Sequence, residues 1–502
     1  MSQPTTQSVP DAAPTPAAIA VPFAAIVLAM LPAVLDQTIL ATALPVIAGD
    51  LGRVTDVSWV VTAYVVAAAA TTPLWGKLGD RHGRKRLLEI ALGAFVVSSA
   101  LCGAAQDITQ LVVLRMAQGV AAGGLMTLAM AAVGDLVAPR ERGRYQGYIA
   151  ATFAVATIVG PLIGGVLVDH ASWRWVFYVN LPIGIAALAG LHRTLPAPDP
   201  QRSGAPLDAL GAALLAAATT ALMLTCIWGG ERYAWGSATI LALVAATVAL
   251  AGALVLRERR AADPIVPLAM LRARVVAVAG AVLFLATAAL FAVTVFVPLF
   301  LQTTTGASPT LSGLLLVPAM LGITVSTTLS GRSITRSGRY KRFPIAGLAL
   351  MTSGLIVLAA VAGDPSQAAT GAGLAVFGLG FGMVTQILVI AVQNNVDRRQ
   401  LGVATAATGF FRALGGAIGA ATLGAVFAAH AGAHASDAAA GALRADVIDG
   451  VRAVFVVGAV LAALALAIVL ALPEAPLRTR EQARGSEGEP SRRERPLAQA
   501  RS

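Results

Sequence analysis

The most constraining feature of this sequence is a series of long apolar runs. An α-helix needs about 20 mostly apolar residues to cross the hydrocarbon core of a bilayer. The 502-residue chain holds fourteen such runs, and 57% of its residues are hydrophobic whereas only 12% are charged. We therefore predict an all-α integral membrane protein with 14 spans, at 20–47, 57–76, 87–105, 110–133, 145–168, 175–195, 207–228, 236–256, 275–300, 310–331, 343–363, 368–393, 402–430 and 450–472.

The cations are distributed unevenly among the loops between these runs. When the loops are assigned alternately to two sides, 29 of the 36 Lys and Arg residues fall on the side that holds both termini, and five fall on the other. Basic loops are retained on the cytoplasmic side of a membrane. We therefore expect both termini to be cytoplasmic, and we attribute the net charge of +11 to this topology rather than to nucleic-acid binding.

A basic, glycine-containing loop separates the second and third runs. Its glycines permit a tight chain reversal. Asp80 is the one acid of the loop, and its carboxylate can accept hydrogen bonds from a nearby Arg or from a helix N-terminus, so that it would latch two helices together. A generic cytoplasmic turn explains the cations but not the order of the residues. The candidate gating residues of the loop are Gly76, Asp80, Arg81, Gly83, Arg84 and Lys85.

A degenerate copy of this loop occurs 255 residues later, at 331–341. Gly76, Arg81, Gly83 and Arg84 correspond to Gly331, Arg336, Gly338 and Arg339, whereas Asp80 corresponds to Thr335. Each copy follows the second helix of a set of six. We therefore predict two six-helix bundles, at 20–195 and 263–475, with a linker and two additional spans between them at 196–262. Residues 1–19 are predicted to form a cytoplasmic tail, and the polar residues 476–502 a disordered one.

Asp36 lies inside the first apolar run, with no cation within one helical turn. A carboxylate inside a membrane costs several kcal/mol, roughly 2.5–3.5 on insertion scales, unless it faces a cavity, is paired or is protonated. Asp36 is therefore a candidate proton carrier. The alternative is a permanently protonated acid that only bonds two helices together.

Two arginines also lie inside apolar runs. Arg115 in the fourth run must face the bundle interior or a watery cavity. It cannot release a proton at useful pH, so it would either tune a neighbouring acid or hold a substrate anion, or else lock helices through backbone carbonyls. Gln118 lies beside it. Arg412 in the thirteenth run either lines the cavity or locks helices.

The fifth run contains Gly160-Pro161 followed by Gly164-Gly165. Proline removes a backbone donor and kinks a helix. Glycines four residues apart let another helix approach closely. This pattern suits a seam between two moving halves, and it also suits ordinary helix packing.

These motifs resemble those of the major facilitator superfamily, and of its 14-helix drug:proton antiporter branch in particular. The loop at 76–86 is similar to the signature loop between helices 2 and 3. The segments around Asp36, Arg115 and Gly160 are similar to the motifs of helices 1, 4 and 5. The chain departs from the family pattern at Ala41 or Thr42, where Asn is usual, and at Ala156, where Gly is frequent.

The resemblance implies a secondary antiporter that exports hydrophobic or amphipathic drugs or antibiotics in exchange for protons, in the cytoplasmic membrane of a bacterium. In this interpretation Asp36 carries the proton, Arg115 tunes it, and Asp80 with Arg84 latches the cytoplasmic gate. The expected partners are a small hydrophobic substrate, protons and the bilayer, and the protein is expected to be a monomer without a cofactor.

Two other functions are compatible with parts of this pattern. A dedicated exporter of one endogenous natural product, as in self-resistance, shares the same fold and mechanism. A receptor or scaffold that does not transport would have no need of Asp36 and Arg115. An enzyme is not expected: no phosphate-binding Gly-x-x-x-x-Gly-Lys-Ser/Thr loop is present, so that ATP is not the energy source, and the scattered histidines predict no metal site.

Overall fold

The computed structural model describes residues 16–51, 54–196, 207–230, 232–305, 315–363, 366–431, 440–474 and 477. The predicted disordered tail at 476–502 except for Leu477, most of the N-terminal tail and most of the linker that precedes the inserted spans lie outside these residues.

The described residues form helices and no named strand. The helices are α1 (Pro16–Leu51), α2 (Val54–His82), α3 (Arg84–Gly103), α4 (Ile108–Leu136), α5 (Arg142–His170), α6 (Trp175–Tyr178), α7 (Asn180–Thr194), α8 (Ala209–Trp228), α9 (Ala238–Glu258), α10 (Leu268–Arg272), α11 (Arg274–Thr294), α12 (Phe296–Thr305), α14 (Val317–Ser337), α15 (Arg342–Val361), α16 (Gln367–Asn394), the 3-10 helix η1 (Arg398–Gln400), α17 (Leu401–Ala431) and α18 (Ala440–Val469).

Thirteen segments among the described residues are long and apolar enough to cross a membrane. They match every predicted span except the tenth. That span corresponds to α14, whose buried face carries the polar residues Ser326, Thr327 and Ser330 and whose preceding residues, 306–314, lie outside the described ranges. With α14 the helices are consistent with the predicted 14-span architecture. The sixth span differs in detail, because it is interrupted at Val179 between α6 and α7.

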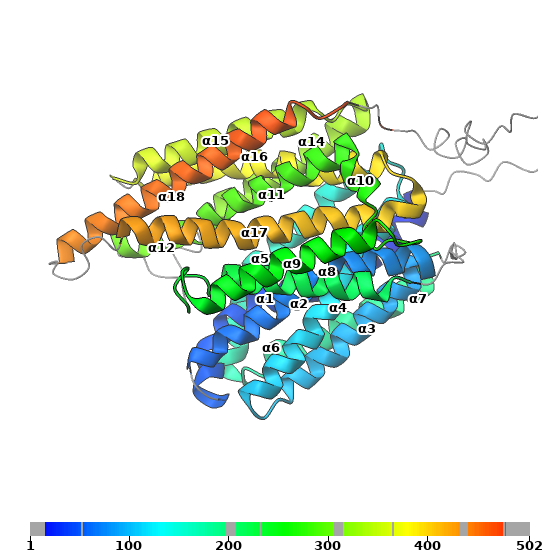
Figure 1. Cartoon of the computed structure of the whole chain (residues 1–502), viewed down its shortest axis with the longest axis horizontal. Coiled ribbons are helices and arrows are strands. Elements are labelled where there is room, and N and C mark those ends of the chain that lie inside the picture. The colour runs from blue at the N-terminus through cyan, green and yellow to red at the C-terminus, as the bar shows by residue number, and fades with distance from the viewer. Residues whose placement is uncertain are drawn as a thin grey trace, which may run out of the picture.

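Two sets of six spans repeat the same packing (Figure 1). In the first set, α1–α7, α4 packs against α2 and α3, α1 against α5 and α7, and α3 against α7. In the second set, α11–α18, the same neighbours recur: α16 packs against α14 and α15, α11 against α17 and α18, and α15 against α18. We call these sets the first and second halves. The repeated packing agrees with the loop repeat in the sequence.

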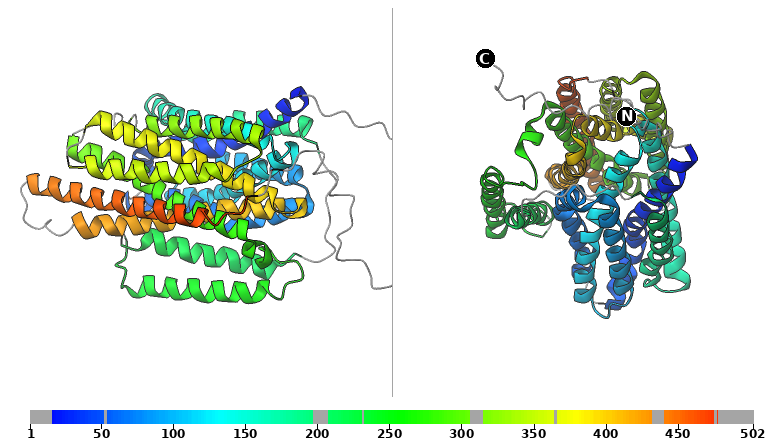
Figure 2. Two further views of the ribbon diagram at one scale, coloured as in Figure 1. Left: turned by 90° about the horizontal axis from the view of Figure 1, so that it is seen from above. Right: turned by 90° about the vertical axis from the view of Figure 1, so that its right-hand side faces the viewer.

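The remaining two spans, α8 and α9, form a hairpin outside the two halves. Figure 2 shows this green pair to one side of the other helices. Of the two, α8 contacts α2 and α17, one helix from each half. Trp228 of α8 packs edge-on against Trp59 of α2 at a centroid distance of 5.3 Å. Trp59 is therefore a packing residue between α2 and the hairpin.

The two halves meet along two helix pairs, α2 with α17 and α5 with α14. These pairs are equivalent by the repeat, because each joins the second helix of one half to the fifth helix of the other. The basic loop and its copy lie at one end of the molecule, which we call the basic end. At corresponding positions in the two loops, Gly83 and Gly338 have φ of 90° and 69°. This left-handed conformation favours glycine, which explains why both copies of the loop retain it.

Candidate functional site

Asp36 and Arg115 form an ion pair in the interior of the first half. Arg115 Nη1 donates to Asp36 Oδ2 at 2.6 Å, and the two residues are only 2% and 1% exposed. The sequence placed both charges within apolar runs, and the family resemblance implied that Arg115 tunes Asp36, but their direct contact could not be read from the sequence. A buried charge is tolerated when it is paired and its remaining donors or acceptors are satisfied. The pair therefore explains how both residues persist within apolar spans.

Two carboxamides complete the surroundings of the Asp36 carboxylate. Gln118 donates from Nε2 to Asp36 Oδ1 at 3.1 Å and accepts from Arg115 Nη1 through Oε1 at 2.7 Å. Asn180, at the first turn of α7, lies with Nδ2 3.5 Å from Asp36 Oδ1 and donates to Ser99 Oγ at 3.1 Å. The carboxylate thus contacts side chains of α4 and α7, so that its charge state affects how these helices pack around α1.

The guanidinium of Arg115 is also fixed by α2. Its Nε donates to the backbone carbonyl of Val60 at 3.1 Å, and its carbon lies 4.2 Å from the centre of the Tyr64 ring, a cation–π geometry. The close approach depends on Gly119, where an added Cβ would lie 2.8 Å from Tyr64 Cα. The glycine in the fourth-helix motif therefore allows α2 to reach the arginine.

The glycine motif of α5 packs against α1. An added Cβ on Gly160 would overlap Thr38, and one on Gly164 would overlap Thr42 and lie 2.8 Å from the carbonyl of Ile39. Gly165 faces open space, and Pro161 is exposed. The close-packing face of this motif thus lies within the first half, two to six residues along α1 from Asp36, and is not part of the seam between halves.

The seam at the α2–α17 interface contains Asp80. Its Oδ1 accepts from the backbone N–H of Gly402 at 2.8 Å, and its Oδ2 from that of Val403 at 2.9 Å, at the first turn of α17. Arg84 Nη2 donates to the same carboxylate at 2.6 Å, and Arg84 also pairs with Asp135 of α4. Carboxylates are favourable at helix N-termini. Asp80 therefore makes both contacts that the sequence suggested for it, one with a nearby Arg and one with a helix N-terminus, and the second of these links the two halves.

The α5–α14 interface is held by a cation, whereas the α2–α17 interface is held by the Asp80 carboxylate. Arg140, in the α4–α5 loop, donates from Nε to the carbonyl of Thr335 and from Nη2 to that of Arg336, both at 2.8 Å. These carbonyls belong to the last turn of α14, where a cation is favourable. Thr335 is the position that corresponds to Asp80 in the repeat. A guanidinium at a helix C-terminus thus replaces a carboxylate at a helix N-terminus.

Backbone contacts bring the halves close at both interfaces. An added Cβ on Gly76 would lie 2.6 Å from the carbonyl oxygen of Gly402, and one on Gly143 would lie 2.6 Å from that of Gly331. Gly76 and Gly331 are one of the two pairs of glycines that match in the loop repeat. A third contact between halves links Arg142 Nη1 to Gln393 Oε1 at 3.3 Å.

The other predicted loop residues make different contacts. Arg81 Nη1 lies 3.6 Å from Asp263 Oδ2, and Lys77 also pairs with this acid, so that the segment after α9 is tied to α2. Lys85 donates to the carbonyl of His192 at the end of α7, at 2.8 Å. None of these three contacts joins the first and second halves directly.

Arg412 is not part of the Asp36 cluster. Its Nε is buried and has no hydrogen-bond partner among the residues that the structure describes. The glycines that follow it pack α17 against α11: an added Cβ on Gly415 or Gly419 would meet the backbone of Phe284 or Ala288. The helix-locking contacts of this motif are therefore made by its glycines.

Several residues of the site were not predicted: Tyr64, Ser99, Asp135, Arg140, Arg142, Asn180 and Gln393. The sequence offers only a weak indication of their role. Each is a polar residue within a span or near its end, and such a residue is equally well explained by helix packing. Asn180 is the clearest omission, because an amide in an apolar run is fully buried in the structure.

The fold and these motifs agree with comparisons to known proteins. The model of the Major Facilitator Superfamily matches residues 26–420. A relative in Mycobacterium tuberculosis, an MFS-type transporter described as uncharacterized, is 41% identical over 409 residues, which cover 81% of this chain and 59% of the relative's own length. The multidrug transporter protein MdtP of Bacillus subtilis is 34% identical over 407 residues, 81% of this chain and 75% of its own.

Similarity extends to fungal proteins and to a solved structure. The acurin A biosynthesis cluster MFS-type transporter of Aspergillus aculeatus is 33% identical over 426 residues, 82% of this chain and 76% of its own. The structure of the proton:xylose symporter XylE matches with a TM-score of 0.66 at 15% identity and covers 94% of this chain and 99% of its own. The chain therefore belongs to the Major Facilitator Superfamily, a family of membrane transporters rather than enzymes.

Proposed function

We propose that the protein is a proton-coupled antiporter that exports hydrophobic or amphipathic small molecules across the cytoplasmic membrane by alternating access. The observation that carries this proposal is the ion pair between Asp36 and Arg115, buried inside membrane-spanning helices. Intramembrane ionisable residues mark proton and substrate pathways. The similarity to multidrug transporters supports export of drugs.

Proton binding at Asp36 would change the packing of the first half. A protonated Asp36 no longer attracts Arg115, whereas Arg115 keeps its contacts to Val60 and Gln118. The contacts that hold α1 to α4 would therefore weaken. With Asp36 deprotonated and the cavity open to the cytoplasm, substrate enters; protonation from outside weakens the hold on the substrate and releases it.

The helices around the ion pair are also those that join the halves. The Val60 carbonyl and Asp80 both belong to α2, which packs on α17. Through Gly160 and Gly164, α1 packs on α5, which meets α14. The hydrogen bonds described between the halves lie at the basic end, which we assign to the cytoplasm. The described arrangement is thus the state closed on the cytoplasmic side, and opening requires the Asp80 and Arg140 contacts to separate.

The test is transport by the purified protein in liposomes with an imposed proton gradient, followed with a fluorescent lipophilic cation. We expect gradient-driven movement by the wild type and its loss in Asp36→Asn. Asp107→Asn is the matched control, because Asp107 caps the N-terminus of α4 and Asn retains that cap. Transport retained in Asp36→Asn would refute Asp36 as the coupling acid.

A second candidate is a dedicated exporter of one natural product. The similarity to the transporter of the acurin A biosynthesis cluster favours it. A panel of structurally unrelated compounds in the same liposomes distinguishes the two functions: transport of several compounds supports a multidrug exporter, and transport of one supports the dedicated exporter.

A further inference from the structure

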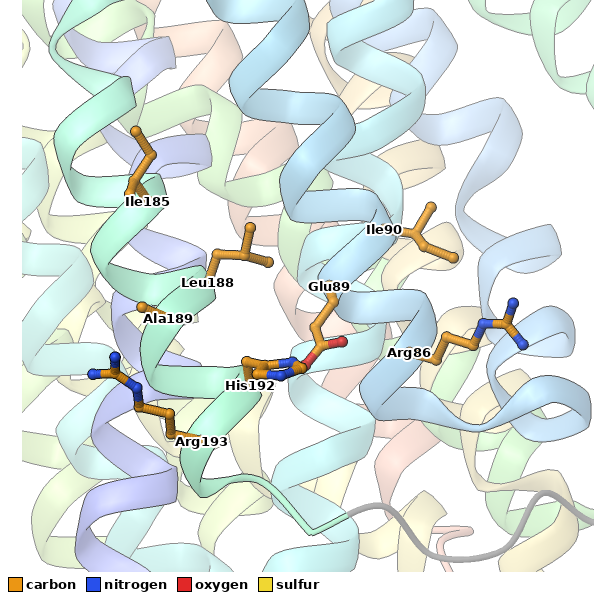
Figure 3. A pocket seen from close by; sticks show the side chains of 8 residues that line it. All are labelled: Arg86, Glu89, Ile90, Ile185, Leu188, Ala189, His192 and Arg193. Carbon is orange, nitrogen blue, oxygen red and sulfur yellow. The ribbon is translucent and has the colours of Figure 1, made fainter.

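A groove separate from the ion pair lies between α3 and α7 at the basic end. It has a volume of about 720 Å³. Figure 3 shows Glu89 and His192 facing each other across it, with Arg86 and Arg193 at its two sides. Lys85 holds the ends of the two walls together through its bond to the His192 carbonyl.

The upper part of the groove is apolar and faces outward. Ile90 of α3 and Ile185 of α7 are 49% and 59% exposed, and Leu188 lies between them and the charged part. Both helices are among the segments able to span a membrane. Exposed apolar side chains on such helices face lipid chains, so that the groove opens to the bilayer rather than to the interior of the transporter.

The polar part of the groove provides cations and one acceptor without a partner. Arg86 and Arg193 are exposed and can extend their guanidinium groups toward the membrane surface. Glu89 Oε1 is buried and has no hydrogen-bond partner among the described residues; it lies 3.5 Å from His192 Nδ1. Arg86, Arg193 and Glu89 together give the lining a formal charge of +1, and Glu89 supplies a carboxylate oxygen that accepts no hydrogen bond from the described residues.

We propose that this groove binds an anionic glycerophospholipid whose headgroup carries hydroxyl groups, such as phosphatidylglycerol. Arg86 and Arg193 hold the phosphodiester, a hydroxyl of the headgroup donates to Glu89, and an acyl chain lies along Ile90 and Ile185. Basic pockets between membrane helices on the cytoplasmic side suit such headgroups. This inference concerns the lipid-facing surface and does not rest on the proposed transport function.

The test is native mass spectrometry of the full-length protein in detergent, titrated with phosphatidylglycerol. We expect the double variant Arg86→Gln/Arg193→Gln to bind this lipid on the order of 10- to 30-fold more weakly, given the usual contribution of each cation at a membrane surface. Arg259→Gln/Arg260→Gln removes the same charge from exposed positions outside the groove and is the matched control. Equal weakening in both double variants, or weakening in neither, would overturn the proposal.

The role of Glu89 is tested with phosphatidylmethanol, which carries the same charge but no headgroup hydroxyl. We expect the wild type to prefer phosphatidylglycerol, Glu89→Leu to lose this preference, and Glu89→Gln, which keeps an acceptor oxygen, to retain it. A wild type that binds both lipids equally would contradict recognition of the hydroxyl. Thermal unfolding of each variant, compared with the wild type, establishes that it is folded.

Discussion

The carboxylate of Asp80 accepts the backbone N–H of Gly402, a residue 322 positions away in the other half of the molecule. A second oxygen of the same carboxylate accepts the N–H of Val403. One side chain at the end of α2 therefore caps the N-terminus of α17, and the cap exists only while the two halves are in contact at the basic end.

We expect Asp80→Ala to shift the protein toward the state open at the basic end. A helix cap contributes about 0.5–2 kcal/mol, which corresponds to a population change of about 2- to 30-fold. Asp80→Asn, with one acceptor oxygen, should be intermediate. The measurement is the distance between spin labels at His82→Cys and Arg399→Cys, in a background that carries Cys102→Ala and Cys226→Ala. A distance distribution unchanged by Asp80→Ala would show that the cap does not control closure.

The glycines of the loop repeat should be sensitive to a single methyl group. A Cβ on Gly76 meets the backbone of Gly402, and one on Gly331 meets that of Gly143, so that Gly76→Ala and Gly331→Ala should each destabilise the closed state by about 1–3 kcal/mol and reduce transport. The control is Gly165→Ala, because Gly165 has open space around it and alanine favours a helix. Transport assays measure the loss of activity, and thermal unfolding measures the loss of stability. If Gly165→Ala proves as harmful as Gly76→Ala, the steric argument is wrong.

Removal of one member of the buried ion pair should cost more than removal of both. Arg115→Gln leaves the Asp36 carboxylate buried without its cation, a loss of about 3–5 kcal/mol in the free energy of unfolding. The double variant Asp36→Asn/Arg115→Gln leaves no unpaired charge and should recover part of this stability. The unfolding temperatures of the single and double variants in detergent show which of them is more stable. A double variant less stable than Arg115→Gln would exclude this coupling.

A second carboxylate beside Asp36 should move the pH dependence of transport. Asn180→Asp places an acid within reach of Asp36 Oδ1, and a neighbouring like charge disfavours ionisation. If Asp36 is the coupling acid, the pH of half-maximal transport should therefore rise by about one unit or more. Asn180→Ser removes the amide without adding charge and should lower the rate while leaving the midpoint in place. A midpoint that does not move in Asn180→Asp would separate Asp36 from proton coupling.

The architecture was predictable because membrane spans have a strong local signal. The apolar runs and the loop repeat predicted the 14-span fold without any knowledge of contacts. The deviation at α14 arises because half of that helix faces α5 and α16 rather than lipid, so that its composition is less apolar.

The contacts of the site were less predictable because they join residues far apart in the sequence. Asp36 and Arg115 each stand out as a charge in an apolar run, but their pairing depends on α1 and α4 being neighbours. Asn180 carries no charge and so gave no comparable signal. Arg140 looked like one more loop cation, and only its position against the last turn of α14 distinguishes it.

The charged side chains that hold the two interfaces both come from the same half of the molecule. Asp80 and Arg140 both belong to the first half, and the helix ends that they bind, at Gly402 and Thr335, both belong to the second. At these two contacts the repeat is therefore symmetrical in shape but not in chemistry: the first half supplies a charged side chain and the second half supplies the dipole of a helix end. If the gene were split between α9 and α11, the two fragments would be complementary partners, and neither would find in a second copy of itself the groups that it binds in the other.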